Sequence, residues 1–305
     1  MTRQAVVVGA GFVGGAIAAA LSVTDCQVTV VSRRPVPLPL GVRGAVGTLD
    51  RTLLASVIGP DTAVVYAAGP SVPSHVEADP SLLLDSMAGL ELTLDVVRRN
   101  PGSRLFFISS GGTVYGSPTS LPVAEDAPLR PVSAYGRGKL TAERRVKEYA
   151  LKHQVRAVSL RCSNAYGPGQ HANRGQGLVA ALLDAARGDG RIVVWGDGTA
   201  VRDYIFIEDI AHAVARLIGV GCDTLGDRYA INLGSGTGTS VLDLIHAVGD
   251  VTGRPIEYEL APSRSLDVPQ ITLDVGLLCS IIDFNPVPLA DGLAKTWAAT
   301  QRAAG

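Results

Sequence analysis

A glycine-rich turn between an apolar run and an alanine-rich run constrains the fold of this chain more than any other feature. Residues 5–8 (Ala-Val-Val-Val) suit a buried strand, residues 9–14 (Gly-Ala-Gly-Phe-Val-Gly) have the spacing GxGxxG, and residues 15–21 suit a helix. In this setting the glycines permit a tight turn, a close approach of the backbone to a diphosphate, and close helix–strand packing. The free amides that begin the helix would face the phosphates. The turn therefore predicts a dinucleotide site with contacts from Gly9, Gly11, Phe12, Val13 and Gly14.

The end of the second predicted strand, residues 27–31, indicates which dinucleotide is preferred. A site for NAD usually has an aspartate or glutamate here, which accepts hydrogen bonds from the ribose hydroxyls. This chain has Ser32, Arg33 and Arg34 instead, and a hydroxyl with two guanidinium groups suits a 2′-phosphate. We therefore favour NADP(H) over NAD(H), with two solvated loop arginines as the alternative. The proline-rich residues 35–47 are predicted to form a loop.

Strands and helices alternate along the rest of the first half of the chain. Apolar runs at residues 62–66, 105–108 and 155–160 predict further buried strands, separated by helical patterns. Such alternation is typical of an α/β fold, here a Rossmann-type doubly wound parallel sheet. Because ligands bind at the carboxyl ends of such strands, the small and hydroxyl residues that follow two of them are predicted cofactor contacts. These residues are Ala67, Ala68, Gly69 and Ser109.

We expect the chain to have two parts, since it contains no internal repeat, low-complexity tract or long linker. Residues 1–165 are predicted to form the dinucleotide-binding Rossmann domain, to which a segment near residues 200–235 returns. Residues 166–305 are predicted to form mainly a smaller C-terminal substrate-binding lobe. This lobe is expected to close over the carboxyl edge of the sheet, where ligands of such folds bind.

Tyr135 and Lys139 stand four residues apart at the start of a helix-like run, residues 135–151. This spacing places both side chains on one face of the helix. A phenol ordinarily titrates near pH ~10, and a neighbouring ammonium group is expected to lower its pKa toward neutrality. Tyr135 could then exchange a proton with a sugar or alcohol hydroxyl, and Lys139 could also hold a cofactor ribose. The pair is a weak pattern alone and gains weight from the dinucleotide turn.

The composition excludes several functional classes. Of 305 residues, 47% are hydrophobic and 18% are charged, as in a well-packed globular protein, and the net charge of −1 gives no electrostatic footprint for nucleic acid or an anionic membrane. The four cysteines are scattered, which indicates free thiols in a reducing compartment and predicts no metal site. No apolar run approaches the ~20 residues of a membrane span. We therefore expect a cytoplasmic protein.

Six landmarks follow one another along nearly the whole chain. They are the turn at 9–14, Ala67-Ala68-Gly69, Ser109-Ser110 running to Val114-Tyr115-Gly116, Tyr135 with Lys139, Asn164 with Tyr166-Gly167-Pro168, and Arg202-Asp203-Tyr204. In this order they resemble the landmarks of the extended short-chain dehydrogenase/reductases. Within these, the chain is similar to the NAD(P)-dependent epimerase/dehydratase family, which acts on nucleotide sugars.

The resemblance implies a bound nicotinamide cofactor and a nucleoside-diphosphate sugar, with hydride exchanged at a sugar carbon, commonly C4. Tyr135 would be the acid/base, and Lys139 would hold the ribose and tune Tyr135. Asn164 and Arg202 match positions that hold the substrate diphosphate, and Arg264 resembles an arginine that commonly joins them. Guanidinium groups suit that role because they can make two parallel hydrogen bonds to a phosphate.

Two departures from the family pattern bear on the reaction. The family's catalytic Ser/Thr position falls on Gly111, which has no hydroxyl, so Thr113 or Ser110 would supply the missing hydrogen bond to the substrate oxygen. Gly112 and Thr113 stand where the family's 4,6-dehydratases have an Asp-Glu pair for proton chemistry. Without these carboxylates, a dehydratase is not expected.

Three functions are weighed on this basis. We favour NADPH-dependent reduction of the C4 ketone of a nucleotide-linked 4-keto-6-deoxyhexose, with TDP as the nucleotide and Tyr135 as the proton donor. The alternative is an NAD-dependent UDP-hexose 4-epimerase that works through a transient 4-keto sugar. A catalytically silent dinucleotide-binding scaffold is the third, and the intact Tyr135–Lys139 pair argues against it. Analogy with the family implies a homodimer formed by the predicted helix at 81–99 and the Tyr135 helix.

Overall fold

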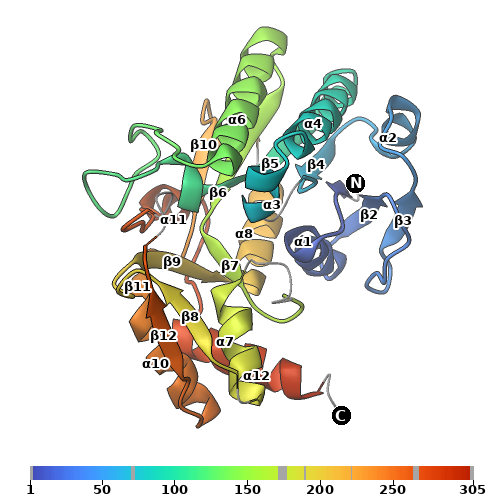
Figure 1. The fold of residues 1–305 in the computed structure, drawn as a ribbon. Coiled ribbons are helices and arrows are strands. Elements are labelled where there is room, and N and C mark those ends of the chain that lie inside the picture. Colours follow the sequence, from blue (N-terminus) through green and yellow to red (C-terminus); the bar gives the residue numbers. More distant parts are fainter. Residues whose placement is uncertain are drawn as a thin grey trace.

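The computed structural model describes residues 3–69, 73–170, 177–188, 190–220, 222–263 and 268–302. At its centre is a seven-stranded parallel sheet in the order β10-β6-β5-β4-β1-β2-β3 (Figure 1). This order runs outward from β1 in both directions, which is the doubly wound arrangement that the sequence predicts. The strands are β1 (Arg3–Val8), β2 (Cys26–Ser32), β3 (Arg43–Val46), β4 (Thr62–Tyr66), β5 (Arg104–Ser110), β6 (Arg156–Cys162) and β10 (Ala230–Leu233).

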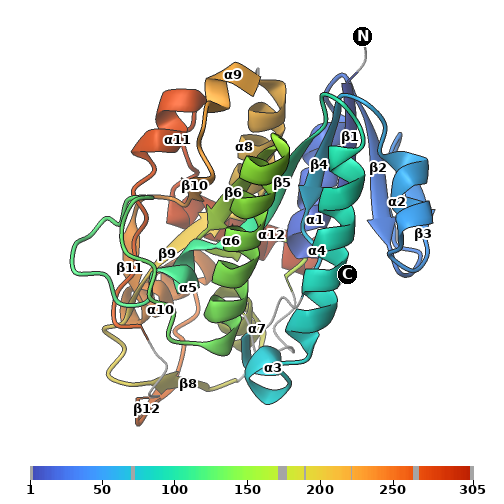
Figure 2. The same cartoon turned by 90° about the horizontal axis from the view of Figure 1, so that it is seen from above.

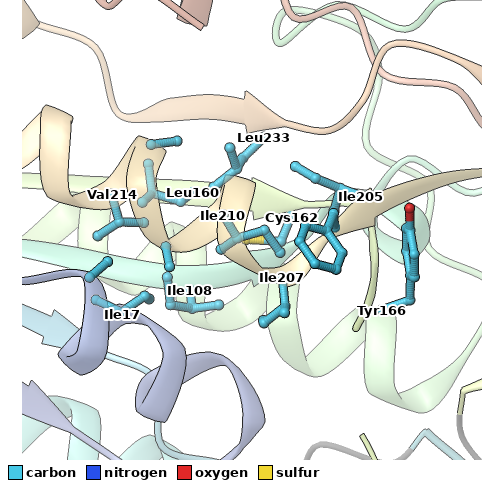
Figure 3. Close-up of a cluster of buried hydrophobic side chains, with 14 of the residues drawn as sticks. Ile17, Ile108, Leu160, Cys162, Tyr166, Ile205, Ile207, Ile210, Val214 and Leu233 are labelled. Atoms are coloured by element: carbon cyan, nitrogen blue, oxygen red, sulfur yellow. The ribbon is translucent and has the colours of Figure 1, made fainter. Parts of the chain in front are cut away.

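Alternate residues of the strands face two helical layers. Along β1, Val7 packs into a core with α1 and α8, whereas Val6 packs into a second core with α2, α4 and α6. Successive side chains of a strand point to opposite faces, and both faces are apolar because helices cover both. Figure 3 shows Ile17 of α1 and Val214 of α8 beside Ile108 of the sheet. The helices of these layers are α1 (Phe12–Ser22), α8 (Ile207–Gly219), α2 (Arg51–Val57), α4 (Leu82–Arg98) and α6 (Ala134–His153).

Helix α6 lies beside α4 over the sheet, as both views of the ribbon show (Figures 1 and 2). Its start is fixed by Ser133, whose hydroxyl accepts a hydrogen bond of 3.0 Å from the amide of Gly136. Its end is fixed by Gln154, which adopts the left-handed conformation with φ of 54°. These two caps place Tyr135 in the first turn of α6, at the end of the helix that lies beside the carboxyl ends of β5 and β6.

The smaller lobe is built from two short sheets with helices packed on them. Strand β9 lies between β7, to which it is parallel, and β11, to which it is antiparallel, while β8 and β12 form a separate parallel pair. Helix α10 packs against α7 and α12. The strands are β7 (Asn164–Tyr166), β8 (Ile192–Trp195), β9 (Val201–Phe206), β11 (Gly238–Ser240) and β12 (Tyr258–Ala261). The helices are α7 (Leu178–Arg187), α10 (Val241–Thr252) and α12 (Leu289–Arg302).

Four short helices complete the described chain: α3 (Pro73–Ala78), α5 (Gly111–Val114), α9 (Cys222–Leu225) and α11 (Gly276–Ile281). From the second half of the chain, α8 packs on α1 and β10 pairs with β6, so both belong to the larger sheet unit. One prediction is wrong: residues 43–46, within the predicted loop, form the edge strand β3, which pairs with β2. The prolines that precede residues 43–46 suggested a loop. The strand is stabilised by hydrogen bonds to β2, which the local sequence does not reveal.

Candidate active site

The turn after β1 depends on two glycines that touch the backbone of their neighbours. Gly9 has φ of +106°, and a Cβ there would lie 2.6 Å from the amide nitrogen of Ala68. A Cβ at Gly14 would lie 1.9 Å from the carbonyl oxygen of Gly9. Larger residues at either position would therefore push apart β1, β4 and α1. This explains the first and third glycines of the pattern by packing alone.

Gly11 differs from these two glycines because its Cβ direction is open, with no atom within 4 Å. It begins α1, and no described side chain caps the amides of that first turn, which include those of Phe12 and Val13. Exposed amides at a helix N-terminus, beside a glycine that leaves room, form a site for an anion such as a diphosphate. The residues present therefore fit the diphosphate of a nicotinamide dinucleotide.

The carboxyl ends of the neighbouring strands border this turn. The amide of Ala67, which follows β4, donates to the carbonyl of Val8 over 2.8 Å, and Gly69 has φ of +137°. At the end of β2, the Ser32 hydroxyl donates to the carbonyl of Arg34 over 2.7 Å, and the side chains of Arg33 and Arg34 are exposed. The Ser32 hydroxyl is thus engaged within its own turn, and the two arginines remain accessible to solvent.

Tyr135 and Lys139 lie together at the carboxyl ends of β5 and β6, as their spacing predicts. The Nζ of Lys139 lies 5.7 Å from the centre of the Tyr135 ring and 5.1 Å from that of Phe107. It donates a hydrogen bond of 2.9 Å to the carbonyl of Ile108 at the end of β5. Tyr135 itself is buried and shares a hydrogen bond with Ser110.

Burial governs the protonation of this cluster. It raises the pKa of Tyr135 above its ordinary value, and the hydrogen bond from Ser110 opposes this only in part. Burial lowers the pKa of Lys139 to about 8, while Cys162 and Glu143 oppose that shift. The expectation that the pKa of Tyr135 is lowered toward neutrality is therefore wrong for this arrangement, because loss of hydration dominates.

The structure separates the two candidates for the missing hydroxyl. Ser110 is the residue that bonds Tyr135, whereas the hydroxyl of Thr113 donates to the carbonyl of Ser110 over 3.3 Å. At Gly111 a Cβ would lie 2.6 Å from Cδ1 of Leu273 and 2.8 Å from the carbonyl oxygen of Arg161. A side chain at Gly111 would therefore require these neighbours to move.

The predicted substrate-binding residues lie on two paired strands beside this cluster. Asn164 of β7 pairs with Tyr204 of β9, so Asn164 and Arg202 lie near the same end of that sheet. The Asn164 side-chain oxygen would lie 3.1 Å from a Cβ at Gly112, which brings the amide beside the α5 turn. Arg202 donates to the carbonyl of Val201 over 2.9 Å. Arg264 lies outside the described residues.

Two buried carboxylates near the site were not predicted. Asp203, 1% exposed, accepts hydrogen bonds from Ser163, Ser235, Gly236 and Leu273, which ties β6 and β9 to two later segments. Residues 203–206 are all buried, so no alternation along this strand marks Asp203, and its hydrogen-bond partners come from distant parts of the chain.

The second unpredicted carboxylate is Glu143, which lies one turn beyond Lys139. It accepts hydrogen bonds from Ser109 and from Arg161, whose Nη2 is 2.9 Å away. The Ser109 hydroxyl, a predicted cofactor contact, is thus engaged by Glu143. The spacing of four residues through Tyr135, Lys139 and Glu143 was the available signal.

The fold and this site define a class: a Rossmann-type nicotinamide-dinucleotide enzyme with a tyrosine–lysine pair. Comparison with known proteins is more specific. A sequence model of the NAD dependent epimerase/dehydratase family matches residues 5–233. The chain belongs to this family, as its landmarks predict.

Individual relatives agree with the family match. The UDP-glucose 4-epimerase of Corynebacterium glutamicum is 33% identical over 277 residues, which are 85% of this chain and 83% of the relative. The crystal structure of the Thermus thermophilus UDP-glucose 4-epimerase in complex with NAD has a TM-score of 0.88, with 25% identity, and covers 99% of this chain and 100% of its own. MoeE5 in complex with UDP-glucose and NAD has a TM-score of 0.85 and 27% identity, with the same coverage.

Two further observations concern what the described residues lack. None of their helices combines the length and the apolar character that crossing a lipid bilayer would require. In the same ranges, no three His, Cys, Asp or Glu side chains are grouped so that they could hold a metal ion.

Proposed function

We propose that this protein is a nucleotide-sugar 4-epimerase that interconverts two UDP-hexoses through a transient 4-keto sugar. The observation that carries the proposal is the placement of Tyr135 beside Lys139 at the carboxyl end of the sheet: the Lys139 Nζ lies 5.7 Å from the centre of the Tyr135 ring and donates to the carbonyl of Ile108 at the end of β5. The UDP-glucose 4-epimerases among the relatives support it, as do the structural neighbours that hold NAD and UDP-glucose. These comparisons favour the epimerase over the 4-ketoreductase that the sequence analysis ranks first.

Each residue of the cluster has a defined task in this proposal. A bound nicotinamide supplies reversible hydride acceptance from C4 of the sugar. Tyr135 takes the proton of the 4-hydroxyl and returns it, and Ser110 donates a hydrogen bond to the same oxygen. Burial favours the neutral phenol, so the phenolate needs positive charge nearby, which Lys139 provides. Lys139 also holds the cofactor ribose in this proposal.

Substrate binding is assigned to the paired strands of the smaller lobe. Asn164 and Arg202 would hold the nucleotide diphosphate, together with Arg264. Thr113 on the α5 turn would contact the sugar, because it lies next to the Ser110–Tyr135 pair. We also propose a homodimer formed through α4 and α6. Leu84 of α4 and Leu151 of α6 are 71% and 57% exposed, and a second subunit would cover these apolar side chains.

One observation favours the ketoreductase as second candidate. Arg33 and Arg34 are exposed at the end of β2, where a reductase that consumes NADPH would recognise the 2′-phosphate. An epimerase regenerates its cofactor in every cycle and needs no exchangeable NADPH.

A pair of assays separates the two functions. Purified protein is incubated with UDP-glucose or UDP-galactose, and product is measured together with nicotinamide absorbance. Interconversion without net change in absorbance supports the epimerase. In the second assay the protein is mixed with NADPH and TDP-4-keto-6-deoxyglucose. Oxidation of one NADPH for each sugar reduced, with no interconversion of the UDP-hexoses, would identify the protein as a ketoreductase and not an epimerase.

The cofactor preference can be tested at Arg33 and Arg34. If they bind a 2′-phosphate, replacing both with alanine should weaken NADP(H) binding roughly 100-fold or more and leave NAD(H) binding unchanged, since each charge-assisted hydrogen bond contributes about 1.5–3 kcal/mol. Dissociation constants of both cofactors are measured by calorimetry. Arg43→Ala, which removes an exposed arginine at the start of β3, is the control. An unchanged ratio of the two dissociation constants would show that these arginines do not discriminate between NADP(H) and NAD(H).

The hydroxyl assignment predicts unequal effects at two neighbouring positions. Ser110→Ala should lower kcat roughly 10²-fold, because the reacting oxygen loses a positioned donor. Thr113→Ala should lower kcat less, because the Thr113 hydroxyl bonds the backbone of Ser110 and not Tyr135. Steady-state kinetics of UDP-hexose interconversion measure both. The reverse order of effects would assign the catalytic hydroxyl to Thr113.

A further inference from the structure

Glu143 is buried one turn beyond Lys139, on the helix face that also presents Tyr135. Its carboxylate and the guanidinium of Arg161 are 6% and 5% exposed, and they are joined by hydrogen bonds of 2.9 to 3.2 Å. The carboxylate also accepts from the hydroxyl of Ser109, the residue next to Ser110. Glu143 therefore connects the Tyr135 helix with the end of β5 and with β6.

Arg161 extends this connection to the turn that follows β5. Its Nη1 donates to the hydroxyl of Tyr115 over 2.9 Å, and Tyr115 donates to Asn232 of β10 over 2.6 Å. Tyr115 directly follows α5, so the ion pair braces the turn that holds Ser110 and Thr113 as well as the helix that holds Lys139. Such a fully bonded buried pair fixes its partners in one arrangement.

Few charges act on Lys139. Among the described residues these are Glu143 on its own helix and the thiol of Cys162 on β6, and Arg161 lies behind Glu143. Three carboxylates of the neighbouring helices α3 and α4 have other partners. Glu91 pairs with Arg145, Asp95 with Arg98, and Glu77 accepts from the amide of Ala134. Burial raises the pKa of Cys162 to about 12, which leaves Glu143 as the nearby negative charge. Glu143 is one helical turn from Lys139, and the two side chains bond the neighbouring residues Ser109 and Ile108 of β5.

We propose that Glu143 is a positioning residue: its buried carboxylate holds Lys139 as an ammonium ion beside Tyr135, and Arg161 sets the strength of that effect. The proposal deepens the proposed function, since it rests on Lys139 being the charge that supports the Tyr135 phenolate. Without Glu143, burial would release the proton of Lys139 closer to neutral pH. Arg161 offsets part of the negative charge, so removing Arg161 strengthens the hold of Glu143 on the Lys139 proton.

The direct test is the titration of Lys139 by NMR. The chain has four lysines, so carbon-13 labelling at their ε-carbons gives few signals, and the Lys139→Arg variant identifies the signal of Lys139. The wild-type midpoint is expected near pH 8. Glu143→Gln should lower it by about one pH unit, and Arg161→Gln should raise it. Glu148→Gln, which removes an exposed carboxylate of the same helix, should leave it unchanged.

If Glu143 acts on Lys139 in this way, Glu143→Gln and Arg161→Gln shift the Lys139 midpoint in opposite directions. Disrupted packing alone would shift the midpoint in the same direction in both variants. Each variant tests the proposal separately, so failure of one to fold leaves the other informative. An unmoved midpoint, or shifts of the same sign, would overturn the proposal. The titration needs neither substrate nor activity, and it therefore remains decisive if the protein proves not to be an epimerase. In an active epimerase, the alkaline limb of the kcat–pH profile should move with the midpoint of Lys139.

Discussion

Replacing Tyr135 with phenylalanine is expected to lower kcat for UDP-hexose interconversion roughly 10²–10⁴-fold, the range for loss of a general acid/base. The substitution removes only the hydroxyl that bonds Ser110, and it leaves the buried ring beside Lys139 in place. The fold and cofactor binding should therefore be retained. Initial rates with UDP-glucose and UDP-galactose measure the effect, and thermal unfolding checks the fold.

Tyr149→Phe is the matched control for this experiment. Tyr149 is buried on the same helix, and its hydroxyl accepts a hydrogen bond of 3.2 Å from Arg98, away from the site. Its loss should leave kcat within a few-fold of wild type. If both tyrosine variants retain near wild-type activity, Tyr135 is not the proton-transfer group. If the unaltered protein converts no nucleotide sugar, a dinucleotide-binding scaffold is the better description of this protein.

The largest expected loss of stability follows from Asp203→Ala. The carboxylate accepts hydrogen bonds from the amides of Ser235, Gly236 and Leu273 and from the hydroxyl of Ser163, over 2.8 to 3.2 Å. Each buried donor left without an acceptor costs about 1–3 kcal/mol. We expect the free energy of unfolding to fall by about 3 kcal/mol or more, measured by denaturation in urea.

Asp197→Ala serves as the comparison for Asp203→Ala. Asp197 is exposed and accepts hydrogen bonds only from Thr199, two residues away, among the described residues. Its removal should change the free energy of unfolding by less than about 1 kcal/mol. Equal losses for the two variants would mean that Asp203 does not hold the later segments against β6 and β9.

Local patterns in the sequence predicted the features that depend on nearby residues. The GxGxxG spacing predicted the turn after β1, because Gly9 and Gly14 meet a few residues apart. The spacing of Tyr135 and Lys139 predicted their shared helix face. Alternating apolar runs predicted the doubly wound sheet, which the structure and its neighbours confirm.

Features that depend on tertiary contacts could not be predicted from the sequence alone. The strand at residues 43–46 forms because β2 offers a pairing edge, and the prolines before it suggested a loop. The glycine at position 111 is required by Leu273, far along the chain, together with the carbonyl of Arg161. The pKa of Tyr135 depends on how deeply the ring is buried, which spacing along a helix does not show.

The sheet order also decides when this molecule can be completed during synthesis. Strand β10, residues 230–233, forms the outer edge of the cofactor-binding sheet, beside β6, which ends at Cys162. The ribosome must therefore make α7, β8, β9 and α8 before that edge is covered. An uncovered strand is a template for pairing with another chain. During synthesis the protein therefore passes through a stage in which the predicted cofactor-binding residues have been made while one edge of the sheet can still pair with another chain.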